Sequence, residues 1–294
     1  MRPNLSIAVF FCLLSGFLVA AEGDAVVIRG TPSMLALGQQ LITLYNNDAP
    51  NTKIGINVAD SVQSLPAGGR TIWQTVRPLD KTQREQLHQR FGSTAREIPI
   101  AIEGMVVIVN RNNPVADLTV LQLRSIYQGQ TTNWKDVGGR DAPIRLYSTE
   151  ALVGGSQFFT DLVLHGEDMD TTMRGFVNPK ETERAVATDA NGIGLIPIPD
   201  EKDVIYPRIH RSGETPGVVA SIENIRSLEY PLSSKVYWVI AEQHPAAISD
   251  FVRFTLSPRG QLAAEASGYY PLNPVDRSQA MMLATALPAS HDWR

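Results

Sequence analysis

Residues 106–156 constrain the fold more than any other part of the chain. They begin with an apolar run of β-forming residues at 106–110, and a loop leads from this run into an amphipathic segment at 118–127 with helical spacing. A short strand is predicted at 144–147, followed by a glycine-bearing turn at 154–156 that opens into a helix. Such a turn leaves backbone N–H groups free at a helix start, where an anion can bind.

The composition excludes one large class of function. The chain has 294 residues, of which 43% are apolar and 19% are charged, as in an ordinary soluble globular protein with one large domain or two small ones. Its net charge of −4 and its pI of about 5.8 provide no basic surface of the kind that nucleic-acid binders need. We therefore expect no nucleic-acid partner.

The N-terminal segment has the pattern of a secretory signal peptide. A basic residue near the start is followed by an apolar run at 5–19 and then by Ala20-Ala21. This run is shorter than the roughly 20 apolar residues that a membrane-spanning helix needs. Residues 1–21 are therefore expected to be removed, so that the mature chain begins near Glu22. The single cysteine, Cys12, lies inside this segment, which leaves the mature chain with no disulfide to form.

No pattern of catalytic or metal-binding residues stands out. The five histidines show none of the spacings that zinc sites use, and the mature chain has no cysteine to complete such a site. Gly154, Gly155 and Ser156 lack the second glycine of a serine-hydrolase elbow. The chain is therefore expected to be a non-enzyme without a metal or another cofactor.

The order of residues in the central stretch resembles that of the phosphate-binding protein of bacterial phosphate ABC transporters. The matched residues are Val109-Asn110, Asn113-Pro114, Leu118-Thr119, Gln122-Leu123, Ile126-Tyr127, Gly129, Thr132-Asn133-Trp134, Gly138-Gly139 and Ile144. Further matches at Arg77-Pro78-Leu79, Gly192-Ile193-Gly194 and Gly268-Tyr269-Tyr270-Pro271-Leu272 extend the resemblance over nearly all of the mature chain.

The resemblance implies the type II periplasmic binding protein fold. This is an α/β fold with two lobes, whose mixed sheets are joined by two crossover strands, here expected near Val109 and near Ile196. The expected division is lobe I at residues 22–109 and 197–272, lobe II at 110–196, and a C-terminal tail at 273–294.

The same resemblance implies a function. The family's members are periplasmic solute-binding proteins that close their lobes around phosphate. For this chain we expect a periplasmic location, phosphate or another small oxyanion as ligand, and an inner-membrane ABC permease as partner. Two alternatives stay open: the same fold with a different, less charged small ligand, or a non-transport adaptor or sensor that docks to a membrane partner.

The candidate ligand-binding residues are hydroxyl-bearing residues and glycines. They are Thr31, Ser33, Ser61, Thr71, Thr75, Thr149, Gly154, Gly155 and Ser156. Thr31 and Ser33 are equally explained as caps of the helix that follows them.

The resemblance also implies that the phosphate site has changed. An ungapped alignment places Thr71, Thr149, Val153 and Gly155 where the family has aspartate, arginine, serine and threonine. The lost aspartate accepts a proton from phosphate, and the lost arginine makes a charge-assisted bond of about 1.5–3 kcal/mol. Phosphate affinity is therefore predicted to be weak, at roughly micromolar or poorer, unless another cation such as Arg77 or Arg145 takes over the anion.

Overall fold

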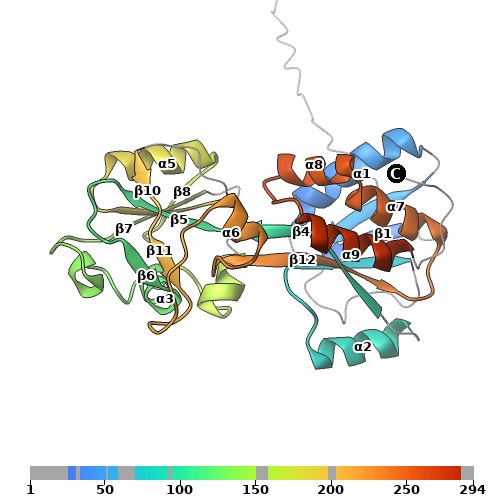
Figure 1. Cartoon of the computed structure of the whole chain (residues 1–294), viewed down its shortest axis with the longest axis horizontal. Coiled ribbons are helices and arrows are strands. Elements are labelled where there is room, and N and C mark those ends of the chain that lie inside the picture. Colours follow the sequence, from blue (N-terminus) through green and yellow to red (C-terminus); the bar gives the residue numbers. More distant parts are fainter. Residues whose placement is uncertain are drawn as a thin grey trace, which may run out of the picture.

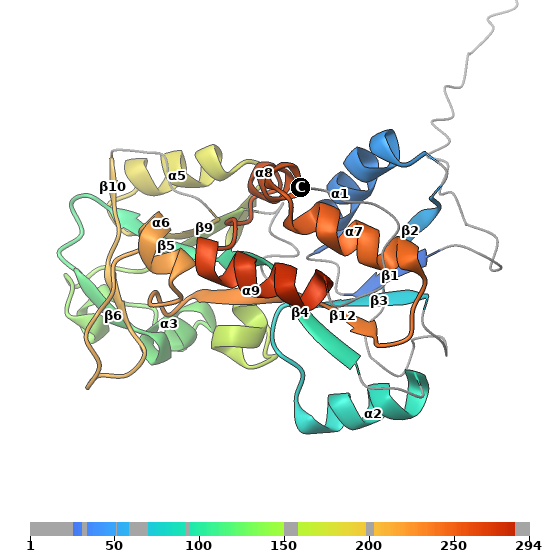
Figure 2. The ribbon, with the colours of Figure 1, turned by 45° about the vertical axis from the view of Figure 1, so that its right-hand side comes forward.

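The computed structural model describes residues 26–30, 34–50, 52–58, 70–91, 95–149, 158–197 and 203–285. Two five-stranded sheets form the centres of two lobes, which lie at opposite ends of the long axis of the molecule (Figure 1). The view from a second side shows the same two bodies, with β4 and β12 running toward the junction between them (Figure 2). The two-lobed α/β fold with mixed sheets is thus confirmed.

Lobe I is built on a sheet with the strand order β2-β1-β3-β12-β4. Its strands are β1 (Val26–Gly30), β2 (Ile54–Val58), β3 (Thr71–Thr75), β4 (Ala95–Gly104) and β12 (Ser233–Ala241). β1 is parallel to β2 and β3, whereas β12 is antiparallel to β3 and β4. The described helices of this lobe are α1 (Leu35–Asp48), α2 (Lys81–Phe91), α7 (Ala246–Leu256), α8 (Pro258–Ala266) and α9 (Pro274–Thr285).

Lobe II is built on a second sheet with the order β10-β5-β9-β7-β8. Its strands are β5 (Val106–Asn110), β7 (Arg145–Thr149), β8 (Arg174–Phe176), β9 (Gly192–Ile196) and β10 (Val204–Ile205), and β6 (Asp117–Thr119) pairs separately with β11 (Arg208–His210). The described helices are α3 (Val120–Tyr127), α5 (Pro179–Thr188), the short η3 (Trp134–Val137) and the π-helical turn η5 (Thr160–Leu164). Helix α6 (Ile222–Arg226) lies at the junction and packs on β4 of lobe I.

The two central strands of lobe II explain the apolar runs of the sequence. Every residue of β5 and of β9 is buried, as expected for strands covered on both faces. Helix α5 packs directly on them. A Cβ atom added at Gly194 of β9 would lie 2.8 Å from the Val186 side chain of α5, so a glycine is needed for this close approach.

The chain changes lobes at Met105. β4 ends at Gly104 in the first sheet and β5 begins at Val106 in the second. The return connection follows α6 and enters β12, whose Ser233 pairs with Gly104. The Met105 backbone N–H donates to the Leu232 carbonyl oxygen at 2.9 Å, which holds the two crossover segments side by side.

The predicted crossovers near Val109 and near Ile196 are therefore wrong in position. All of β5 belongs to the second sheet, because Val106 pairs with Ile196 and Val109 with Ile193. After Ile196 the chain stays in lobe II, where β10 pairs with the end of β5. The apolar run at 98–109 has no local signal that would mark the change of sheet, since both of its halves are buried strands.

The predicted C-terminal tail is a helix of lobe I over its described part. α9 packs against α7 and β4, and buries Ala280 and Ala284. The Arg253 guanidinium donates to the Ala284 carbonyl oxygen at 3.1 Å, which ties the end of α9 to α7. Small residues four apart let α9 approach its neighbours closely.

None of the helices in the described ranges is long and apolar enough to cross a membrane.

Candidate functional site

The strand registers define one edge of each sheet that faces the lobe junction. In lobe II this edge contains the start of β5 and the ends of β7 and β9, because Val106 pairs with Ile196 and Ser148 pairs with the adjacent Leu195. Thr149, the last residue of β7, therefore lies at this edge. We call it the crossover edge of lobe II, after its proximity to Met105.

The corresponding crossover edge of lobe I contains the end of β4, the start of β12 and the end of β3. Ser233 pairs with Gly104, and the antiparallel pairing of Tyr237 with Thr75 directs the end of β3 toward the same side. β1 is parallel to β3, so its last residue, Gly30, points the same way. Strands β1, β3 and β7 thus all end on the side of their sheets that faces the lobe junction.

Thr71 lies at the opposite edge of the lobe I sheet. It pairs with Val27 near the start of β1, whereas Gly30 pairs with Gln74. Thr71 and Thr75 lie four residue steps apart along the strand, a distance of about 13 Å. Thr71 is also buried, with 2% of its surface exposed. The structure therefore does not bring Thr71 together with Thr75 and Thr149. The sequence alignment could not predict this, because it does not show which end of a strand faces the ligand.

Thr75 and Arg77 form a local turn at the crossover edge of lobe I. The Thr75 hydroxyl donates to the Arg77 carbonyl oxygen at 3.0 Å and accepts from the Arg77 backbone N–H at 3.4 Å. The Arg77 side chain is exposed, and it makes no ion pair with any residue in the described ranges. The Val76 carbonyl oxygen between them accepts from the Ser234 hydroxyl at 3.2 Å, which anchors the turn to β12.

Thr149 is used inside lobe II. Its hydroxyl lies 2.9 Å from the hydroxyl of Thr182 on α5, and both side chains are buried. This bond fixes the end of β7 against α5 immediately before residues 150–157. The Thr149 hydroxyl is therefore already bonded within lobe II, to Thr182.

Six of the predicted site residues lie outside the described residues. They are Thr31, Ser33, Ser61, Gly154, Gly155 and Ser156, and Val153 lies outside them as well. What the structure does establish is where the neighbouring described residues lie. Gly30 and Thr149, which come just before two of these segments, both end strands at crossover edges.

Glu103 is a residue of the crossover edge that the sequence analysis did not select. It is the penultimate residue of β4, it is 7% exposed, and its carboxyl Oε2 has no hydrogen-bond partner in the part of the chain described. Burial, and then the nearby charge of Asp161, raise the pKa of Glu103 to about 8. A lone acidic residue inside the apolar run at 98–109 is the sequence signal that could have identified it.

Arg145 lies away from the crossover edge. It is the first residue of β7 and pairs with Gly192, at the other end of the strand from Thr149. Its guanidinium forms an ion pair with Asp189 at 3.4 Å, and the Tyr147 hydroxyl donates to the same carboxylate at 2.7 Å. Arg145 is thus not placed to share an anion with Arg77.

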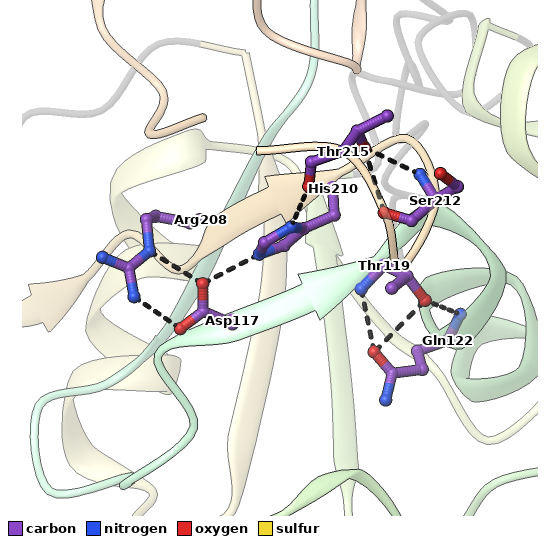
Figure 3. A network of polar contacts seen from close by, with 7 residues as sticks. All are labelled: Asp117, Thr119, Gln122, Arg208, His210, Ser212 and Thr215. Atoms are coloured by element: carbon purple, nitrogen blue, oxygen red, sulfur yellow. Dashed lines mark hydrogen bonds and ion pairs between the residues drawn. The ribbon is translucent and has the colours of Figure 1, made fainter. Parts of the chain in front are cut away.

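A second polar cluster lies between β6 and β11 and is shown in Figure 3. Arg208 donates two bonds of 2.7 Å to the Asp117 carboxylate, and the His210 Nε2 atom lies 2.8 Å from the same carboxylate. The His210 Nδ1 atom lies 2.7 Å from the Thr215 carbonyl oxygen. Hydrogen bonds from Arg208, and then from His210, hold the pKa of Asp117 well below its usual range.

The geometry of this cluster indicates that it stabilises the fold and does not bind a ligand. A carbonyl oxygen and an ionised carboxylate can only accept hydrogen bonds, so the two bonds of His210 form together only when both ring nitrogens are protonated and the ring is positively charged. Neither nitrogen is left to accept a proton or bind a metal. Bonds to Asp117 and Thr215 accordingly raise the pKa of His210. The cluster binds β11 and the turn at 211–217 to β6.

Several residues that carry the sequence resemblance also have structural roles. Thr119 and Gln122 form a reciprocal cap at the start of α3, also drawn in Figure 3. Asn133 caps η3, and the Trp134 indole N–H donates to the Asn191 carbonyl oxygen at 2.9 Å while its ring is buried. Trp134 is therefore a packing residue. Within the described ranges, no group of three or more histidine, cysteine or acidic side chains could hold a metal ion.

Comparisons with known proteins give a consistent result. Residues 18–259 match the family model of the PBP superfamily domain. Protein SphX of Synechococcus elongatus is 25% identical over 268 residues, covering 87% of this chain and 77% of that protein. The phosphate-binding protein PstS of Staphylococcus haemolyticus is 25% identical over 253 residues, covering 82% of this chain and 79% of that protein.

A solved structure also matches the fold. The possible phosphate binding protein from Planctomyces limnophilus superposes with a TM-score of 0.76 at 17% identity, and the match covers 90% of this chain and 99% of that chain. At this identity the likeness concerns the fold alone. It extends over both lobes, because nearly the whole of each chain takes part.

Proposed function

Because the chain belongs to the family of the PBP superfamily domain, we propose that it is a periplasmic solute-binding protein that captures phosphate between its lobes. The observation that carries this proposal is the common direction of the strand ends: β1, β3 and β7 all end at the crossover edges, so their following segments begin at the junction of the lobes. In open α/β sheets, ligands bind beyond the carboxyl ends of strands. The sequence similarity to the phosphate-binding protein PstS supports phosphate as the ligand class.

The anion would be held by Arg77 and by neutral donors. Arg77 lies at the lobe I crossover edge, and Thr75 fixes the turn that carries it. Thr31, Ser33, Ser61, Gly154, Gly155 and Ser156 remain the candidate hydroxyl and N–H donors on the segments that follow strand ends. Thr149 serves this site by holding the start of one such segment against α5.

This arrangement supports capture with modest affinity. A site with one exposed guanidinium keeps one charge-assisted interaction, worth about 1.5–3 kcal/mol. Thr71, which the sequence alignment sets in place of the family's proton acceptor, is neutral and lies at the far edge of the lobe I sheet, so it contributes no carboxylate to this site. We therefore expect phosphate dissociation constants of roughly micromolar or poorer and weak discrimination against sulfate.

Location and partner follow from the same proposal. Residues 1–21 would direct export across the inner membrane, and the mature protein would deliver its ligand to an ABC permease. The role is binding without catalysis. Closure of the lobes about Met105 and the 227–232 connection would enclose the ligand, as hinge motions do in periplasmic binding proteins.

Calorimetry on the mature chain tests the proposal. Protein freed of bound ligand by unfolding and refolding is titrated with inorganic phosphate and, separately, with sulfate. Saturable binding of phosphate, with sulfate competing, is the expected result. If neither anion binds at millimolar concentration (about 1 mM), phosphate capture is excluded and a less charged small ligand becomes the better assignment.

A further inference from the structure

Glu103 lies where the two lobes meet. It lies two residues before Met105 and pairs across the sheet with Ser234, the second residue of β12. Both crossover connections therefore pass beside it. A change in the angle between the lobes must alter the surroundings of this side chain more than those of residues deep within either sheet.

The Glu103 carboxyl is buried, and one of its two oxygens lacks a hydrogen bond within the described ranges. Its Oε2 atom has no hydrogen-bond partner in the described part of the chain. The nearest cross-strand hydroxyl, that of Ser234, donates to the carbonyl oxygens of Val76 and Lys235. The Lys235 ammonium group is 2.6 Å from the Asp276 carboxylate, so its charge is neutralised there. A buried carboxylate in such a place is unfavourable, because no cation or donor among the described residues offsets the loss of water at Oε2.

The titratable groups that act on Glu103 come from both lobes. Asp161 of η5 lies in lobe II, and its negative charge is the electrostatic contribution to the Glu103 pKa. Tyr269 lies in the segment between α8 and α9, and its pKa is raised by burial and then by the charge of Glu103. Neither Asp161 nor Tyr269 can supply a positive charge. With the lobes in contact, the neutral acid is therefore the favoured form of Glu103 at neutral pH.

A hydrogen bond between the lobes shows that lobe I and lobe II are in contact in this structure. The hydroxyl of Tyr270 donates to the carbonyl oxygen of Pro197, and Ile102 next to Glu103 pairs with Tyr270. Separation of the lobes would break this bond and move Asp161 away from Glu103. Water would then reach the carboxyl, and an ionised glutamate would no longer be penalised.

We propose that Glu103 binds a proton when the two lobes come together and releases it when they separate, so that ligand capture by this protein is coupled to proton uptake. The proposal rests on the lobe closure that belongs to the proposed function. It adds regulation of lobe closure by the protonation of Glu103, a carboxyl that lies at the junction and need not touch the ligand. Alkaline conditions would favour the separated lobes, and acidic conditions the closed ones.

Small-angle X-ray scattering on the ligand-free mature chain tests this coupling. From about pH 6 to about pH 10, a range that brackets the Glu103 value of about 8, the radius of gyration of the wild type is expected to rise. Glu103→Gln should show no such rise, and Asp161→Asn should move the transition to lower pH, because it removes the neighbouring negative charge. Glu214→Gln, an exposed carboxyl on the 211–217 turn, is the matched control and should behave as wild type.

Proton uptake on binding gives the second readout. Titration of inorganic phosphate into protein in buffers of different ionisation enthalpy measures the protons taken up, and the protonation of phosphate itself is common to all variants. At a pH where the scattering shows the ligand-free wild type with its lobes apart, the wild type should take up more protons than Glu103→Gln, by up to about one. A scattering transition that is absent from the wild type, or that persists unchanged in Glu103→Gln, overturns the proposal. If phosphate does not bind but the scattering transition depends on Glu103, the coupling stands and the assigned ligand is wrong.

Discussion

The hydroxyl of Tyr270 donates a hydrogen bond of 2.9 Å to the carbonyl oxygen of Pro197, and so connects the C-terminal segment of lobe I to the end of β9 in lobe II. Tyr270 is anchored on the lobe I side by its paired backbone bonds with Ile102. The bond therefore reports directly on the angle between the lobes. It also offers a way to change that angle without altering a residue of the proposed anion site.

Tyr270→Phe should shift the protein toward separated lobes. Removal of the hydroxyl eliminates one net hydrogen bond of about 1 kcal/mol, which corresponds to a population change of roughly five-fold. Fluorescence transfer between dyes placed on the two lobes would measure the change. Tyr147→Phe is the control, since that hydroxyl bonds to Asp189 within lobe II. Equal effects of the two substitutions would contradict a role for Tyr270 at the lobe junction.

Arg77→Gln should weaken phosphate binding by roughly 10- to 100-fold, because it removes a charge-assisted bond of about 1.5–3 kcal/mol. Isothermal titration with inorganic phosphate measures the loss. Arg145→Gln removes the same charge from the opposite edge of the lobe II sheet, where Arg145 pairs with Asp189. That control should bind as wild type, and a comparable loss in it would mean that Arg77 acts only through the net charge of the protein.

Thr149→Val should destabilise lobe II without changing its shape. The substitution leaves the buried Thr182 hydroxyl without its partner, at a cost of about 1–3 kcal/mol in the free energy of unfolding. Urea denaturation measures this quantity. The double variant Thr149→Val with Thr182→Val should recover part of the loss, because no buried hydroxyl is then unpaired. A double variant that is as unstable as the sum of both single variants would argue against the bond.

The contribution of His210 to stability should disappear in alkali. Bonds to Asp117 and Thr215 raise its pKa in the folded state, so the folded protein holds this proton more tightly than the unfolded chain. Its stabilisation is complete below the unfolded value of about 6.5 and is lost as pH rises through the folded value. The difference in unfolding free energy between wild type and His210→Gln, measured against pH, should therefore shrink toward alkaline pH. A difference that stays constant would show that His210 acts by packing alone.

Local patterns account for much of the secondary structure. The spacing at 118–127 predicts a helix, and α3 occupies Val120–Tyr127 behind a reciprocal cap formed by Thr119 and Gln122. The first residues of the predicted segment differ because Leu118 belongs to β6, which pairs with Ile209 of β11. A cap depends on residues three apart, whereas that strand depends on a partner far along the chain.

The candidate site also combines features that depend on neighbouring residues with features that depend on residues far apart in the sequence. The amino-acid sequence by itself determined the apolar strands and the helical spacing at 118–127, and its resemblance to phosphate-binding proteins implied the two-lobed fold. Only the tertiary structure decided that Thr71 and Thr75 occupy opposite ends of one strand, that the lobes change at Met105, and that Glu103 faces the junction. Periodicity and capping act between neighbours in the sequence and leave a visible pattern. Strand register and the burial of a carboxyl between two lobes arise from partners that only folding brings together.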